Sequence, residues 1–123
     1  MDLSEYLSDQ MTVISQSANS LKLSLTIPGT FPYFEGHFPD DAILPASMAL
    51  EISAWLTTAI LLKCDQGVIR KVNRCKFSQN IRPMEPLCID LSVVEDRCFR
   101  SRWLRADGTV AVDVRFTLGG IDQ

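Results

Sequence analysis

The segment 43–62 restricts the folds open to this chain more than any other, because it is apolar almost all round. It reads ILPASMALEISAWLTTAILL. Proline suits the first turn of a helix, so Pro45 predicts a helix that runs from there to about Leu62. The segment is about long enough to span a bilayer, but Pro45 near its start and a charged Glu51 near its middle argue against that. We therefore expect a helix that a globular fold wraps completely.

Alternating apolar and polar residues, the pattern of half-buried strands, dominate the rest of the chain. The expected strands are 11–15, 21–27, 68–77, 87–93, 98–105 and 110–118. In the fifth of these, Arg100 and Arg102 share one face. Asp96-Arg97 and Asp107-Gly108 fall where hairpin turns are needed. This order of elements predicts an α+β fold, in which a curved antiparallel β-sheet wraps around one long central α-helix in a single domain, 1–123.

Composition and cysteine spacing narrow the class of protein further. Hydrophobic residues make up 46% of the 123 residues, enough for a real core. The N-terminus is acidic and lacks the basic and apolar regions of a signal peptide, which predicts a cytoplasmic protein. No C-x-x-C pair is present and His37 is the sole histidine, so we expect no metal site. We expect free thiols, mostly in the core, at Cys64, Cys75, Cys88 and Cys98.

Charge is spread unevenly over a chain whose net charge is −3. Residues 1–62 hold one basic and seven acidic residues, whereas residues 63–105 hold ten basic and five acidic ones. Basic side chains such as Arg70, Lys71 and Arg74 could steer an acidic partner to this half. The alternative is that they are simply solvated charges on strand faces. We expect no nucleic-acid partner.

The helix segment carries one thin polar stripe. At about 100° per residue, Ser47, Glu51 and Thr58 fall within about 40° of one another. A carboxylate buried among apolar side chains is costly unless it is paired or protonated. Such a group tends to keep its proton, which a general acid needs. The alternative, that Glu51 reaches solvent at an edge of the sheet, stays open.

Residues 33–51, YFEGHFPDDAILPASMALE, resemble the signature of the 3-hydroxyacyl-ACP dehydratases of the FabA/FabZ group. That signature is close to G-H-F-P-x-x-P-x-x-P-G, with an acidic residue fourteen positions after the histidine. The residues that match are Gly36, His37, Phe38, Pro39 and Pro45, with Glu51 fourteen positions after His37. Glutamate rather than aspartate at that position is similar to the FabZ branch.

A second stretch, KFSQNIRPMEPL at residues 76–87, is similar to that family's K-F-x-x-P-x-x-P-G-D-x-L. Lys76, Phe77, Pro83 and Leu87 match, and Glu85 stands in for the acid. Three positions depart from the family pattern. Ala42 replaces the first loop proline, Ala46 the glycine at the helix start, and Met84 the glycine of the second motif. We expect these departures to change the substrate shape, or to alter or abolish activity.

The resemblance implies a hotdog fold and a homodimer or higher oligomer. It implies dehydration of a (3R)-hydroxyacyl-ACP thioester to trans-2-enoyl-ACP, with acyl carrier protein as partner and no cofactor. In its length and its ILP run the chain is similar to a subgroup of the family, the small dehydratases of aryl-polyene and related polyketide-like pathways. The implied pathway is therefore of this kind or fatty acid biosynthesis. In this family His37 of one subunit would be the base and Glu51 of the other the acid. The implied substrate contacts are Gly36, Phe38, Pro45 and Ala46, the last through its backbone N–H at the thioester carbonyl.

The reaction chemistry fits these residue types. An imidazole with an ordinary pKa of about 6.5 can take the weakly acidic C2 proton, and a carboxyl can protonate the departing hydroxide. N–H groups at a helix start can stabilise charge on the thioester oxygen. Tyr33, Phe34 and Phe38 could line an acyl tunnel or be plain core. Two alternatives stay open, a hotdog acyl thioesterase and a non-catalytic hotdog protein that binds acyl chains or a partner.

Overall fold

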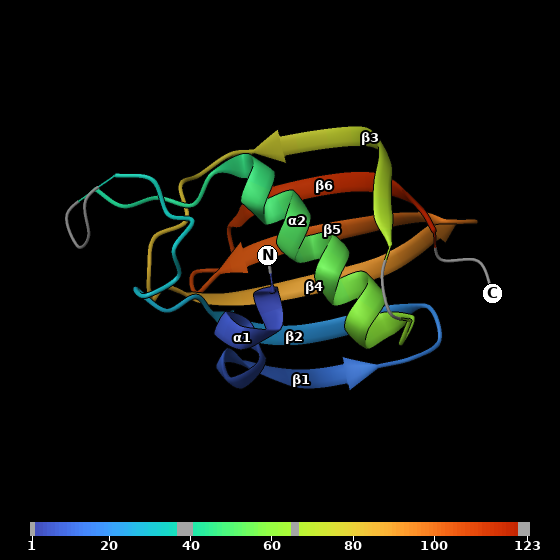
Figure 1. The fold of residues 1–123 in the computed structure, drawn as a ribbon, viewed down its shortest axis with the longest axis horizontal. Helices are drawn as coiled ribbons and strands as arrows, with labels where there is room; N and C mark the ends of the chain where they lie inside the picture. Colours follow the sequence, from blue (N-terminus) through green and yellow to red (C-terminus); the bar gives the residue numbers. More distant parts are fainter. Residues whose placement is uncertain (1, 37–40, 65–66, 121–123) are drawn as a thin grey trace.

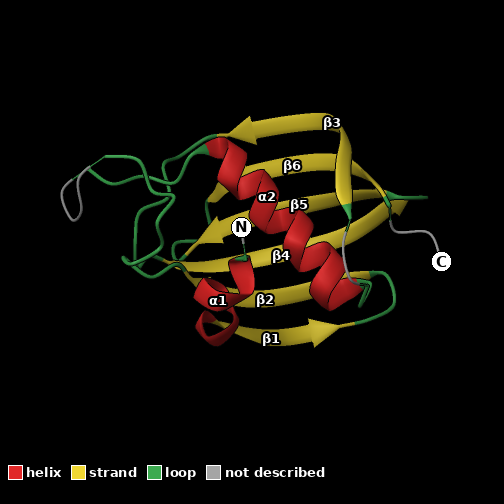
Figure 2. Ribbon diagram, in the orientation of Figure 1, coloured by secondary structure: helices red, strands yellow, loops and turns green. Residues whose placement is uncertain are grey.

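One antiparallel sheet and one long helix form most of the protein in the computed structural model, which describes residues 2–36, 41–64 and 67–120. The helical elements are α1 (Leu3–Leu7), η1 (Ser8–Gln10), α2 (Ala46–Leu56) and η2 (Thr57–Leu61). The strands are β1 (Met11–Gln16), β2 (Ser20–Thr26), β3 (Val68–Phe77), β4 (Pro86–Glu95), β5 (Cys98–Arg105) and β6 (Val110–Gly119). They form a sheet of order β1-β2-β4-β5-β6-β3, which curves around α2 (Figures 1 and 2).

The predicted strands are all present, and the predicted α+β fold of a curved antiparallel sheet around a long helix is confirmed. The bounds of β3 and β5 are those that the sequence predicts. Both predicted hairpin turns contain a residue in the left-handed region, since Arg97 has φ 61° and Gly108 has φ 87°. In β2, β4 and β5, buried residues alternate with more exposed ones, and the buried set faces α2.

The predicted helix is present as α2 followed by the π-helical turn η2. Pro45 is the N-cap of α2, in an extended conformation (φ −65°, ψ 148°), rather than a residue of the first turn as predicted. The Pro45 carbonyl accepts hydrogen bonds from the N–H groups of Met48 and Ala49, at 3.0 and 3.2 Å. Over the described residues, no helix combines the length and the apolar character that crossing a membrane requires.

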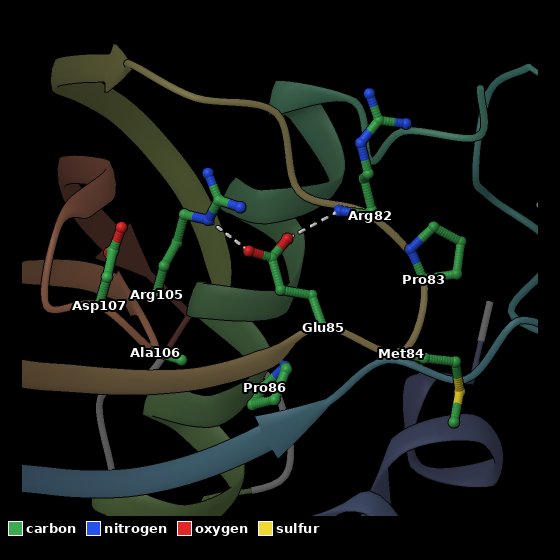
Figure 3. Close-up of a pocket in the computed structure, with 8 residues that line it drawn as sticks. All are labelled: Arg82, Pro83, Met84, Glu85, Pro86, Arg105, Ala106 and Asp107. Carbon is green, nitrogen blue, oxygen red and sulfur yellow. Dashed lines mark hydrogen bonds and ion pairs between the residues drawn. The ribbon is translucent and has the colours of Figure 1, made fainter. Parts of the chain in front are cut away.

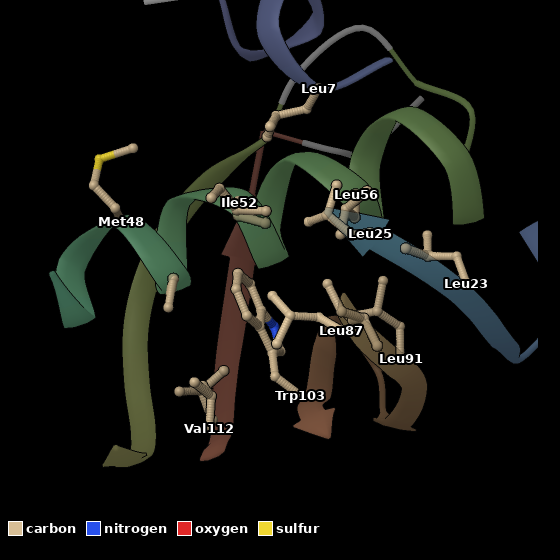
Figure 4. Close-up of a cluster of buried hydrophobic side chains, with 14 of the residues drawn as sticks. Leu7, Leu23, Leu25, Met48, Ile52, Leu56, Leu87, Leu91, Trp103 and Val112 are labelled. Carbon is tan, nitrogen blue, oxygen red and sulfur yellow. The ribbon is translucent and has the colours of Figure 1, made fainter. Parts of the chain in front are cut away.

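The core lies between α2 and the concave face of the sheet. Figure 4 shows Ile52 and Leu56 of α2 facing side chains of β2, β4, β5 and β6. At its centre Trp103 is fully buried, and its Nε1–H donates to the hydroxyls of Ser53 and Ser101, at 3.1 Å each. The Ser53 hydroxyl in turn donates to Ser101 Oγ at 2.8 Å. These bonds tie one face of α2 to β5, so the opposite face, which carries Glu51, is directed outward.

Two sequence predictions need correction. The sequence predicts no helix or strand before residue 11, but α1 lies there on the α2 side of the sheet (Figure 1), and its Leu3 and Leu7 are buried in the core. A helix of this length is too short to show a periodic pattern. The four cysteines are thiols, as predicted, but only Cys98 is buried. Cys75 is exposed on the edge strand β3, and half-buried Cys88 alternates away from buried Leu87 and Ile89 on β4.

Candidate active site

The loop that carries the first motif, residues 35–44, is called the motif loop, and a backbone bridge joins its two ends. Glu35 and Ile43 exchange two hydrogen bonds, at 2.9 and 2.8 Å. The N–H of Leu44 donates to the carbonyl of Ile81 at 2.8 Å, which ties the loop to the second motif. His37 and Phe38, the predicted base and a predicted substrate contact, lie outside the described residues. Their roles therefore stay predictions.

Gly36 is required by the backbone at the start of this loop. Its φ is +92°, a conformation that residues with a Cβ rarely adopt. A Cβ added there would lie 2.4 Å from the carbonyl oxygen of Asp41, well inside van der Waals contact. The motif glycine immediately before His37 thus has a structural cause, a tight turn that only glycine fits.

Aromatic side chains brace the segment that leads into the loop. Phe31 is buried and contacts the rings of Tyr6, Tyr33 and Phe34 edge-on, with centroids 5.8, 5.3 and 5.8 Å away. Edge-to-face pairs of this kind add stability beyond the area that they bury. Tyr33 and Phe34 therefore have a packing role here, and their lining of an acyl tunnel stays a prediction.

The start of α2 presents backbone N–H donors. The N–H groups of Ala46 and Ser47 precede the first intrahelical hydrogen bonds, so they point out of the helix end. Pro45 and Ala46 are half-buried, and Ala42, at the family's first loop proline, is buried. The helix dipole gives this end a partial positive charge. The end is therefore suited to an oxygen that gains negative charge.

Glu51 is exposed on the outward face of α2, together with Ser47. The sequence leaves open whether the Glu51 carboxyl is buried among apolar side chains or reaches solvent at an edge of the sheet. In the single chain it reaches solvent, on the outward face of α2 rather than at a sheet edge. It has no hydrogen-bond or ion-pair partner among the described residues. Thr58, the third member of the predicted stripe, is buried and donates to the carbonyl of Trp55 at 3.2 Å. It lies in the π-helical turn η2, where the spacing of 100° per residue no longer applies.

Comparison with known proteins assigns this combination of fold and motif to a family. Residues 13–113 match the sequence model of the ApeI-like family, described as ApeI dehydratase. The chain belongs to the ApeI-like dehydratase family. The relationship covers both motifs, since it spans the motif loop, α2 and the turn before β4.

Curated relatives of this ApeI-like chain carry the name 3-hydroxyacyl-[acyl-carrier-protein] dehydratase FabZ. The FabZ of Caldanaerobacter subterraneus is 27% identical over 67 residues, which cover 50% of this chain and 48% of that protein. The chain thus spans about half the length of the curated relatives that it matches. A hydroxyacyl dehydratase is the class of function that these matches support.

Solved structures establish the fold as hotdog. The dehydratase heterocomplex ApeI:P from Xenorhabdus doucetiae aligns with a TM-score of 0.71 at 16% identity, over 87% of this chain and 96% of that one. Thioesterase superfamily member 2 from Mus musculus aligns with a TM-score of 0.66 at 14% identity, over 89% and 80%. At these identities the likeness concerns the fold alone.

A hollow of about 470 Å³ lies beside the second motif of the ApeI-like chain (Figure 3). It is lined by Arg82, Pro83, Met84, Glu85, Pro86, Arg105, Ala106 and Asp107. Glu85 forms an ion pair with Arg105 and accepts from the N–H of Arg82 at 3.1 Å. The acid of the second motif therefore clamps the turn to the β5–β6 hairpin. Glu51 does not line this hollow, so we assign the hollow to the scaffold.

Met84 occupies the glycine position of the second motif in a conformation that favours glycine. Its φ is +66° and its side chain is largely exposed. Its N–H donates to the carbonyl of Ile27 at 2.8 Å, which holds the turn against β2. A left-handed conformation costs a residue with a Cβ about 1–2 kcal/mol. The departure from the family glycine thus affects backbone strain at this turn.

Replacing Met84 with glycine is expected to raise the free energy of unfolding by up to about 1 kcal/mol. Glycine relieves the backbone strain of about 1–2 kcal/mol, but its greater freedom in the unfolded chain lowers the free energy of unfolding by about 0.5–1 kcal/mol. Met84→Ala is the matched control, since it shortens the side chain but keeps the strain. Urea denaturation measures both variants. A glycine variant no more stable than the alanine variant would show that the turn is not strained.

Proposed function

We propose that the ApeI-like chain removes water from (3R)-hydroxyacyl-ACP thioesters to give trans-2-enoyl-ACP. The observation that carries the proposal is the position of Glu51, exposed and unpaired among the described residues on the outward face of α2. It lies fourteen residues after His37, the spacing of the dehydratase motif. Membership of a dehydratase family and the glycine-only turn at Gly36 support the same reaction.

In the proposed mechanism His37 takes a proton from C2 and Glu51 gives a proton to the hydroxyl on C3. The C2–H and C3–O bonds break, a C2–C3 double bond forms, and water leaves. Charge that develops on the thioester oxygen is stabilised by the N–H of Ala46 at the start of α2. Each group acts where charge changes in the transition state, so each contributes to rate rather than to binding alone.

We propose that the site is completed by a second copy of the chain. Glu51 lies on a surface with the half-buried Leu50 and Trp55, an apolar setting for an exposed carboxyl. Along β3 the side chains are mostly exposed, among them Val68 (62%) and Val72 (44%). β3 is at the edge of the sheet, and such an edge can pair with another strand. Pairing of two copies through β3 would cover these side chains and could bring His37 of one subunit to Glu51 of the other.

The partner that delivers the substrate is proposed to be an acyl carrier protein, in fatty acid or aryl-polyene-like biosynthesis. Three basic side chains on β3, those of Arg70, Lys71 and Arg74, are exposed. They could contact an acidic carrier protein beside the proposed dimer interface. Arg74 also lies 3.9 Å from Asp113, so its charge is partly used within the chain.

A hotdog thioesterase is the second candidate, because it also uses a carboxylate on the central helix and the mouse thioesterase shares the fold. Incubation with a 3-hydroxyacyl thioester and with a saturated acyl thioester separates the two activities. Dehydration produces the ultraviolet absorbance of a conjugated enoyl thioester from the hydroxyacyl substrate. Hydrolysis releases free thiol from either substrate. We expect enoyl absorbance without thiol release; thiol release without enoyl absorbance would establish the thioesterase instead.

A further inference from the structure

The face of the sheet turned away from α2 carries three arginines side by side. Arg115 of β6 is directly opposite Arg100 of β5 and also directly opposite Arg74 of β3. Residues that alternate with them, such as Phe116, are buried on the α2 side, so the arginines point away from the core. Like charges directly opposite one another destabilise a sheet. We call these three residues the arginine row.

Among the described residues, Asp113 is the acidic side chain that pairs with the arginine row, and its carboxylate already accepts hydrogen bonds from Arg100. Asp113 is 9% exposed and accepts two hydrogen bonds from Arg100, at 3.0 and 2.8 Å. These bonds from Arg100 lower the pKa of Asp113, so its carboxylate stays ionised at neutral pH. Within the described part of the chain, the buried Nε of Arg115 lacks any hydrogen-bond partner. Buried unsatisfied donors are rare in native proteins, and each one calls for an explanation.

A groove of about 430 Å³ adjoins the row over β2, β4 and β5. It is lined by Ser15, Ser20, Leu21, Lys22, Asp90, Leu91, Ser92, Arg100 and Arg102. Arg102 lies 3.8 Å from Asp90, its acidic partner in the groove. Lys22 and three serine residues line the groove with Arg100, which also belongs to the arginine row. Together the row, the groove and the neighbouring Asp113 hold five basic and two acidic side chains, in a chain whose net charge is −3. The positive charge is therefore concentrated on this face.

We propose that this face binds the phosphate group of a small molecule. Guanidinium groups match the oxygens of a phosphate in pairs, and a phosphate offers several strong acceptors to adjacent arginines. The anion would offset the repulsion within the row. The groove has the volume of a small-molecule site and would hold the rest of the ligand. Glu51 is on the other side of the sheet, so the site is separate from the proposed catalytic residues; it shares only Arg74 with the proposed carrier-protein contact.

Thermal denaturation with inorganic phosphate, against sodium chloride at matched ionic strength, tests the site. Phosphate is expected to raise Tm, because a ligand that binds only the folded state stabilises it. Adenosine monophosphate, with adenosine as the control that lacks a phosphate, distinguishes a nucleotide ligand from a free phosphate ion. If the monophosphate raises Tm far more than free phosphate does, the ligand is a nucleotide. If the two raise Tm equally, the site binds only the phosphate group. Equal Tm values in phosphate, monophosphate and chloride would overturn the proposal.

Arg115→Met is the decisive variant. It is expected to lower phosphate affinity by about tenfold or more in calorimetric titration, since it removes a charged hydrogen-bond donor. Without phosphate it should be at least as stable as the wild type, because the repulsion and the buried donor are both removed. Arg82→Met, which removes one exposed positive charge from the turn before β4, is the control and should bind phosphate as the wild type does. Equal affinity losses in both variants would mean that only net charge matters and would overturn the site.

Discussion

Replacing Glu51 with glutamine is expected to lower kcat for dehydration by about 10²–10⁴-fold. Glutamine keeps the size of the side chain but has no acidic proton to give to the leaving hydroxyl. Glu51 is exposed and has no partner among the described residues, so Tm of the variant should match that of the wild type. Enoyl absorbance measures the rate, and circular dichroism on heating measures Tm.

Glu5→Gln is the matched control, since Glu5 is also an exposed helical glutamate but lies on α1. It should retain wild-type kcat. Wild-type activity in a folded Glu51→Gln variant would contradict the role of Glu51 as the acid. Should Glu51→Gln and His37→Ala both leave cellular function intact, the chain would be a non-catalytic binding protein. In that case the alanines at 42 and 46 would mark a lost activity.

Truncating Trp103 to alanine is expected to lower the free energy of unfolding by about 3–5 kcal/mol. Its side chain extends from β5 toward α2 and is fully buried, so truncation leaves a large cavity. It also removes the donor shared by Ser53 and Ser101. Because these bonds hold α2 against β5, the variant should lose dehydratase activity as well, through a displaced Glu51.

Urea denaturation of Trp103→Ala, beside Val94→Ala, measures this effect. Val94 is 42% exposed on β4, and truncation there should change stability by less than about 0.5 kcal/mol. Trp103→Phe should lie between the two variants, since it keeps a ring but not the Nε1–H. Equal losses for Trp103→Ala and Val94→Ala would contradict the central position of Trp103 in the core.

Much of the fold could be predicted from local sequence pattern. The alternation in β5 gives its bounds, because each side chain of that strand has either the core or solvent on its face, whereas β3 has the predicted bounds although its side chains are mostly exposed and do not alternate. The helix α1 could not be predicted, since it is too short for a period to show and its buried leucines depend on distant contacts. The exposure of Cys75 likewise depends on the position of β3 at the edge of the sheet, whereas the outward position of Cys88 follows from the alternation with Leu87 and Ile89.

The candidate site could be predicted only in part. The motif identifies Gly36 and Glu51, and the structure supplies the positive φ that explains the glycine. The solvent exposure of Glu51 was left open by the sequence, because it depends on how α2 is rotated against β5. Likewise, alternation predicts that Arg100 and Arg102 share a face, but only strand register brings Arg100, Arg115 and Arg74 together.

Mixing two inactive variants, His37→Ala and Glu51→Gln, tests most directly whether two copies share one dehydratase site. The subunits are unfolded together and refolded, and enoyl absorbance is recorded. If His37 of one subunit works with Glu51 of the other, half of the dimers are mixed and each has one native site, so roughly a quarter of wild-type activity returns. A refolded mixture as inactive as either variant alone would contradict the shared site.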